Sequence, residues 1–165
     1  MSVLVVGCSN LESRQDTAHR LALSANLYSI VFNTTTFKLQ GFGKFEKPGQ
    51  PLEVFIEGDG LAYISRSRPS RNPTPIDPIS LRLATTSSNP NILYIARPCQ
   101  YVDLNTQTNC KIKIWTTSRF TEDVIKAVNQ AIEIGVQKSQ APHVHIVGYS
   151  GGGAVAALVA ARRQN

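Results

Sequence analysis

The chain has 165 residues, of which 42% are hydrophobic and 17% charged, so it can bury the core of one globular domain. Its net charge is +6, but the basic residues are scattered and do not alternate with aromatic ones, which argues against a nucleic-acid partner. No run of 18 or more apolar residues occurs, so the sequence predicts no membrane-spanning helix.

The N-terminal segment, residues 1–27, is expected to be separate from the main domain. Its start, Val5-Val6-Gly7-Cys8, is similar to the lipobox of bacterial lipoproteins. A signal peptide, however, requires basic residues before its apolar stretch, and no Lys or Arg occurs here before Arg14. Two interpretations stay open. Either this is a clipped signal, with Cys8 lipidated and the protein periplasmic or anchored to a membrane, or Cys8 is an ordinary apolar residue of a cytoplasmic protein. Residues 11–27 predict a weak helix or a linker.

Residues 28–165 begin with segments of β character. Residues 28–42 are rich in β-branched and aromatic side chains and predict two strands or one bent hairpin, and residues 52–57 predict a compact strand. Four prolines between residues 65 and 78 prevent a continuous helix or central strand there.

Helices and strands then alternate. A short helix is predicted over 77–85, with Asp77 as its N-cap and Pro78 at its first helical position. A strand over 91–96 and a helix that begins after Thr121 follow, with Glu122 and Asp123 in the first turn of that helix. A strand over 144–147 and a helix of small residues over 151–163 complete the pattern. This order predicts the α/β class, with a mostly parallel sheet flanked by helices.

The three cysteines do not form a CxxC pair, so we expect no metal site, and nothing in the sequence predicts a cofactor. Cys99 and Cys110 flank a polar stretch that could bring its two ends together. The alternatives of a disulfide between them and of two unconnected thiols both stay open.

The segment Gly148-Tyr149-Ser150-Gly151-Gly152 carries the G-x-S-x-G pattern between a predicted strand and a predicted helix. This context is typical of a nucleophile elbow, in which a tight turn exposes the serine hydroxyl at the carboxyl edge of a sheet. Gly148 and Gly152 are expected because a Cβ would collide there, and the N–H of Gly151 is expected to face a developing oxyanion. The alternative is a turn that binds an anion at the helix N-terminus, over Gly151–Gly153.

A second glycine-rich segment, Gly58-Asp59-Gly60, follows the predicted strand over 52–57. An elbow enzyme takes another oxyanion donor from the loop after its third strand. The backbone N–H of Asp59 is therefore predicted to be that donor, with the N–H of Gly60 as the alternative.

These motifs together resemble a family of bacterial α/β-hydrolases, many of which are described as lipoproteins. The resemblance extends over residues 28–163 and includes runs besides the elbow: Phe55–Tyr63, Arg68-Pro69, Asn72–Pro75, Ala96–Tyr101, Trp115-Thr116 and Arg119-Phe120. It implies a serine hydrolase that cleaves a small-molecule ester, thioester or amide through an acyl-enzyme on Ser150. It also implies that residues 28–165 are the N-terminal half of such a domain.

The chain departs from the family in one respect. The superfamily order is Ser, then Asp or Glu, then His, and residues 151–165 contain none of the last three. We therefore expect a domain truncated after the elbow helix, impaired catalysis, and a complementing downstream fragment as a partner. The alternative is a non-catalytic remnant or binding module.

Overall fold

The computed structural model describes residues 11–163. Cys8 lies outside these residues, so its lipidation stays a prediction. The described elements are, in chain order, α1 (Leu11–Ser24), β1 (Tyr28–Asn33), β2 (Lys38–Phe45), β3 (Leu52–Ile56), α2 (Ile79–Thr86), β4 (Asn91–Ile95), α3 (Ile112–Trp115), α4 (Glu122–Ser139), β5 (Val144–Gly148) and α5 (Gly151–Ala160). The expected α/β class is confirmed.

The five strands form one mixed sheet in the order β1-β2-β4-β3-β5. β3 pairs in parallel with β4 and β5, whereas β2 pairs antiparallel with both β1 and β4. The prediction of a mostly parallel sheet is therefore wrong for β1 and β2. These two strands pair antiparallel with each other because strands joined by so short a turn cannot pair in parallel.

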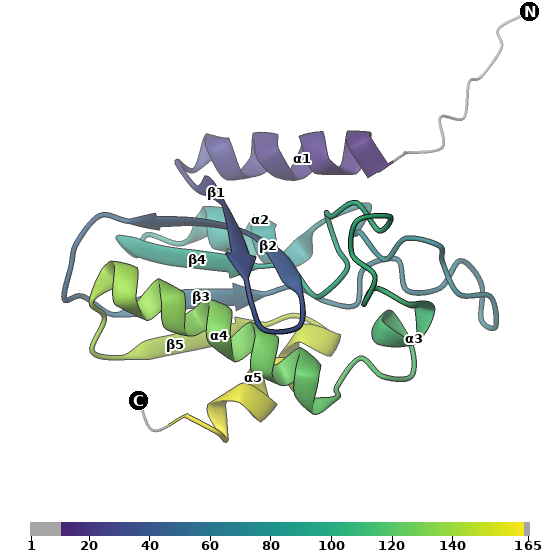
Figure 1. Ribbon diagram of the computed structural model, residues 1–165. Helices are drawn as coiled ribbons and strands as arrows, with labels where there is room; N and C mark the ends of the chain where they lie inside the picture. Colours follow the sequence, from purple (N-terminus) through teal and green to yellow (C-terminus); the bar gives the residue numbers. More distant parts are fainter. Residues whose placement is uncertain (1–10, 164–165) are drawn as a thin grey trace, which may run out of the picture.

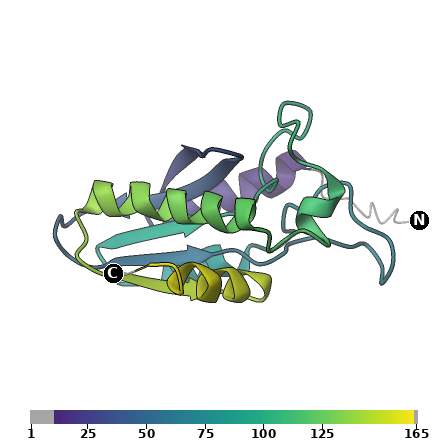
Figure 2. The ribbon, with the colours of Figure 1, turned by 60° about the horizontal axis from the view of Figure 1, so that its bottom comes forward.

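Alternate residues of the central strands supply two hydrophobic cores, one on each face of the sheet. On one face, Val54 of β3 and Leu93 of β4 pack with the apolar stripe of α4 and with Val155 of α5. On the other face, Phe55 and Tyr94 pack with residues of α1 and α2. The result is three layers, with α1 and α2 on one side of the sheet and α4 and α5 on the other (Figures 1 and 2).

The helix boundaries follow the local sequence with small shifts. α2 begins one residue later than predicted, with Pro78 rather than Asp77 at the N-cap position, and Asp77 instead pairs with Arg82 at 2.5 Å. Thr121 is the N-cap of α4, as predicted.

Helix α1 packs on the sheet through its buried Ala18 and Ala22, so it is part of the folded unit. None of the helices within residues 11–163 is long and apolar enough to cross a bilayer.

The path of the chain creates a crevice at the carboxyl ends of β3 and β5. These two strands are parallel neighbours, and the helices that follow them pack on opposite faces of the sheet. Connections that leave two adjacent parallel strands in opposite directions leave an opening between them, which is where α/β proteins bind ligands. The glycine-rich segments that follow β3 and β5 both lie at this position.

Candidate functional site

Ser150 occupies the sharp turn between β5 and α5, and it is exposed. Its backbone has φ 51° and ψ −123°, a conformation that L-residues rarely adopt and that glycine adopts readily. The turn is fixed on both sides, because Tyr149 N–H donates to Ile56 O of β3 at 3.3 Å and Gly152 N–H donates to Tyr149 O at 2.7 Å. β5, the turn at Ser150 and α5 therefore lie at the positions that were predicted from the sequence.

The glycines around Ser150 occupy positions with no room for a side chain. A Cβ on Gly148 would approach the backbone of Gly152 and Gly153 closer than 3.0 Å. A Cβ on Gly152 would approach the carbonyl oxygens of Ile56 and Glu57 equally closely. This packing lets the start of α5 lie directly against the end of β3.

The segment Gly58–Gly60, here called the β3 loop, passes beside Ser150. A Cβ built on Gly58 would lie 3.5 Å from Cβ of Ser150, and the Asp59 carboxylate lies against the Cα of Gly151. Gly60 has φ 62°, which suits the reversal of the chain at this point. Within residues 11–163, the backbone N–H groups of Asp59, Gly60 and Gly151 donate to no protein acceptor.

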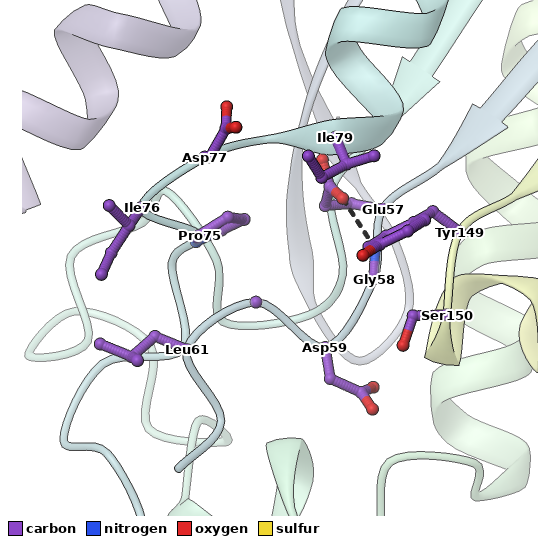
Figure 3. Close-up of a pocket in the computed structure, with 11 residues that line it drawn as sticks. Glu57, Gly58, Asp59, Leu61, Pro75, Ile76, Asp77, Ile79, Tyr149 and Ser150 are labelled. Carbon is purple, nitrogen blue, oxygen red and sulfur yellow. Dashed lines mark hydrogen bonds between the residues drawn. The ribbon is translucent and has the colours of Figure 1, made fainter. Parts of the chain in front are cut away.

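A cavity of about 320 Å³ opens between the β3 loop and the turn at Ser150 (Figure 3). Its walls combine carboxylates with apolar side chains, and Tyr149 and Ser150 line it from the β5 side. The residues from the other elements are Glu57, Gly58, Asp59, Gly60, Leu61, Pro75, Ile76, Asp77 and Ile79. The cavity is large enough for a small organic group beside the serine hydroxyl.

Glu57 lies at the base of this cavity and is only 2% exposed. Burial raises the pKa of its carboxyl group, although hydrogen bonds from Gly58 N–H at 2.9 Å and from the Tyr94 hydroxyl at 3.1 Å partly offset the effect. Burial also raises the pKa of Tyr94 well above its ordinary value, so this phenol stays neutral and its hydroxyl donates a hydrogen bond to Glu57. Glu57 and Tyr94 therefore form a hydrogen-bonded pair that is buried among apolar side chains of this face of the sheet.

Asp59 is held by two arginines. Its Oδ1 lies 3.3 Å from Nη1 of Arg97, and its Oδ2 lies 3.4 Å from Nε of Arg119. Burial and the neighbouring Arg119 lower the pKa of Arg97 to about 10, while Asp59 opposes that shift, so Arg97 remains charged at neutral pH. Both guanidinium groups also stack on the ring of Phe120. The carboxylate is thus fixed in place, and the backbone of Asp59 with it.

Cys99 and Cys110 are joined by a disulfide, with their Cα atoms 5.5 Å apart. This bond constrains the segment that follows β4, and Cys99 lies two residues after Arg97. The described residues contain no cluster of three or more His, Cys, Asp or Glu side chains that could hold a metal ion.

No histidine of residues 11–163 lies beside Ser150. His145 is the second residue of β5 and lies opposite Glu53 of β3 in the sheet register. About 17 Å of extended chain separates it from Ser150, and His143 precedes the strand. His19 is on α1, where its ring packs edge-on against Phe42. The Ser150 hydroxyl also donates no hydrogen bond to any described residue.

The chain matches no protein-family model, and no curated protein matches it as a relative.

Several residues of the site were not predicted, namely Glu57, Gln100 and Arg119. Glu57 follows directly after β3 and precedes Gly58-Asp59-Gly60, and a charged residue at the end of an apolar run was the signal that could have indicated it.

Proposed function

We propose that this protein is a serine hydrolase of the α/β-hydrolase type, with Ser150 as its nucleophile. The observation that carries the proposal is the strained backbone of an exposed serine at the strand-to-helix turn, opposite the β3 loop. Strained residues persist where the surrounding structure enforces them, and they gather at active sites. The strand order β1-β2-β4-β3-β5 with helices on both faces supports the same assignment.

In the proposed reaction, Oγ of Ser150 attacks the carbonyl carbon of an ester, thioester or amide while a base takes the serine proton. The alcohol, thiol or amine leaves with a proton, and water then hydrolyses the acyl-enzyme, which releases the acid and restores the serine. The N–H of Gly151, together with that of Asp59 or Gly60, stabilises the negative charge on the carbonyl oxygen. Within residues 11–163 these three groups have no protein acceptor, which is what an oxyanion site requires. The apolar walls of the cavity, including Leu61, suit a small acyl group.

The proton of Ser150 needs a base that residues 11–163 do not place beside it. We propose that the histidine and its acid come from a complementing segment that packs next to β5. The outer edge of β5 supports this, because within the described chain β5 pairs with β3 alone. Without that segment we expect the intrinsic reactivity of Ser150 to be low.

The alternative of anion binding at Gly151–Gly153 is less well supported. The carboxylate of Asp59 already lies against Gly151 at the N-terminus of α5. In addition, Gly152 N–H and Gly153 N–H already donate to Tyr149 O and Ser150 O, which leaves an anion only the N–H of Gly151 among the three.

Covalent labelling with a fluorophosphonate probe tests the proposal. We expect the probe to modify Ser150, identified by mass spectrometry of the labelled peptide, and Ser150→Ala to abolish the modification. Ser67→Ala is the matched control, because Ser67 is an exposed serine of an ordinary loop. Absence of labelling at Ser150, both alone and with an added complementing fragment, would refute catalysis and favour a non-catalytic binding module.

A further inference from the structure

The turn that follows β4, residues 97–101, lies beside the β3 loop, because β3 and β4 are neighbouring parallel strands. We call it the β4 turn. Gln100 is 1% exposed, and its Nε2 donates to Gly58 O at 2.9 Å and to Pro73 O at 3.5 Å. Its Oε1 accepts the N–H of Arg97 at 3.0 Å. Both ends of this buried amide are therefore used, and each contact is with the backbone.

These contacts fix the β3 loop at both of its ends. Gly58 begins the loop and is bound directly by Gln100. Leu61, just after the loop, donates its N–H to Pro73 O at 3.0 Å, and Pro73 O also accepts from Gln100. A Cβ on Gly60 would meet Nε2 of Gln100 at 2.8 Å, so the amide packs against the middle of the loop as well.

The β4 turn has an unfavourable backbone that its surroundings enforce. Cys99 has φ 72° and Tyr101 has φ 58°, and neither residue is a glycine. Cys99 is held by its disulfide to Cys110, and Tyr101 N–H donates to Oγ1 of Thr74 at 2.8 Å. Two strained residues thus flank Gln100, and their side chains are buried in the two cores, Cys99 in one and Tyr101 in the other. Gln100 is fixed between them with its amide against the β3 loop.

We propose that Gln100 is a positioning residue, which holds the β3 loop so that the N–H groups of Asp59 and Gly60 stay next to Ser150. The catalytic part of this inference rests on the proposed hydrolase function. Oxyanion donors act only at hydrogen-bond distance from the developing charge, so a small displacement of the loop weakens them. Arg97, whose N–H binds Gln100 and whose guanidinium binds Asp59, links the two contacts.

The test compares Gln100→Leu with Gln40→Leu. Gln40 is the matched control, because it is also a buried glutamine whose Nε2 donates to a backbone carbonyl, that of Gly41 at 2.8 Å. Its side chain bonds to residues of β1 and β2 and not to the β3 loop. Two quantities are measured in each variant: amide hydrogen exchange at Gly58 and Leu61, and the rate at which the fluorophosphonate labels Ser150. Gln100→Glu, which keeps the acceptor for Arg97 and loses the donor to Gly58, isolates the donor.

We expect exchange at Gly58 and Leu61 to be at least about tenfold faster in Gln100→Leu than in Gln40→Leu, and labelling of Ser150 at least about tenfold slower. Gln100→Glu should behave like Gln100→Leu. Equal exchange at these two amides in the two leucine variants would overturn the inference, and so would faster exchange with an unchanged labelling rate. If wild-type Ser150 is labelled neither alone nor with an added complementing fragment, the hydrolase proposal fails, and the exchange data alone decide whether Gln100 fixes the loop.

Discussion

Ser150 carries a backbone conformation that costs roughly 1–3 kcal/mol for a residue other than glycine. We therefore expect Ser150→Gly to raise the free energy of unfolding by about 1 kcal/mol, because glycine relieves the strain but has more freedom to lose on folding. Ser150→Ala keeps the strain and should leave stability nearly unchanged. Urea unfolding of the three proteins measures the difference. Equal stability of the glycine and alanine variants would contradict the strained turn.

Gly152 and Gly153 are neighbours in α5 with opposite surroundings. A Cβ on Gly152 would collide with the backbone oxygens of β3, whereas the closest atom to a Cβ on Gly153 is 3.3 Å away. Gly152→Ala should therefore destabilise the fold by at least about 1–3 kcal/mol. Gly153→Ala should be neutral or stabilising by up to about 1 kcal/mol, because alanine favours the helix. The pair is compared by urea unfolding, and similar losses in both variants would be inconsistent with this packing.

Glu57 makes stability depend on pH. Its pKa in the folded protein is raised above the ordinary value of 4.5 by burial, so the unfolded chain releases this proton first. As pH rises above 4.5 toward the folded-state pKa, the wild type should lose stability relative to Glu57→Gln, which cannot ionise. The change is at most about 1.4 kcal/mol per pH unit and stops above the folded-state pKa. Unfolding measured from pH 4 to pH 8 tests the sign, which a constant difference between the two proteins would contradict.

At the scale of elements, the part of the fold that could be predicted is the part in which the signals are local. Residues 144–163 carry a buried strand, a glycine-rich turn and a helix of small residues in direct succession, and β5, the elbow and α5 follow them closely. The antiparallel pairing of β2 with β4 was missed because it joins strands that are far apart in the chain. The contact between Gln100 and Gly58 was missed for the same reason, since 42 positions separate the two residues.

The β4 turn and the disulfide form an element whose contribution to stability can be measured. Cys99 and Cys110 are separated by 11 positions, and closing a loop of this length in the unfolded chain is worth about 3 kcal/mol on the loop-entropy estimate. Reduction, or the double change Cys99→Ser and Cys110→Ser, should lower the free energy of unfolding by about that amount. Guanidinium unfolding with and without a reducing agent measures it. The serine variant should show no further response to the reducing agent, which controls for other effects of reduction.

At the scale of the whole molecule, the proposed function requires a base that the described residues do not place beside Ser150. Ser150 and the free N–H groups of Gly151 and Asp59 lie together, yet the three histidines of the sequence lie elsewhere. A nucleophile without an adjacent base should respond to a base supplied from solution. We therefore expect imidazole to accelerate fluorophosphonate labelling of Ser150 in proportion to its neutral form, by about tenfold or more at high concentration.

Two controls separate this effect from general ones. A sterically hindered buffer of similar pKa at the same pH and ionic strength should give little acceleration, because its crowded nitrogen cannot come within hydrogen-bond distance of the serine hydroxyl. His145→Gln and His19→Gln should label at the wild-type rate, since both side chains lie away from the elbow. A large loss of labelling in either variant would show that an internal histidine already serves as the base, and imidazole would then have nothing to replace.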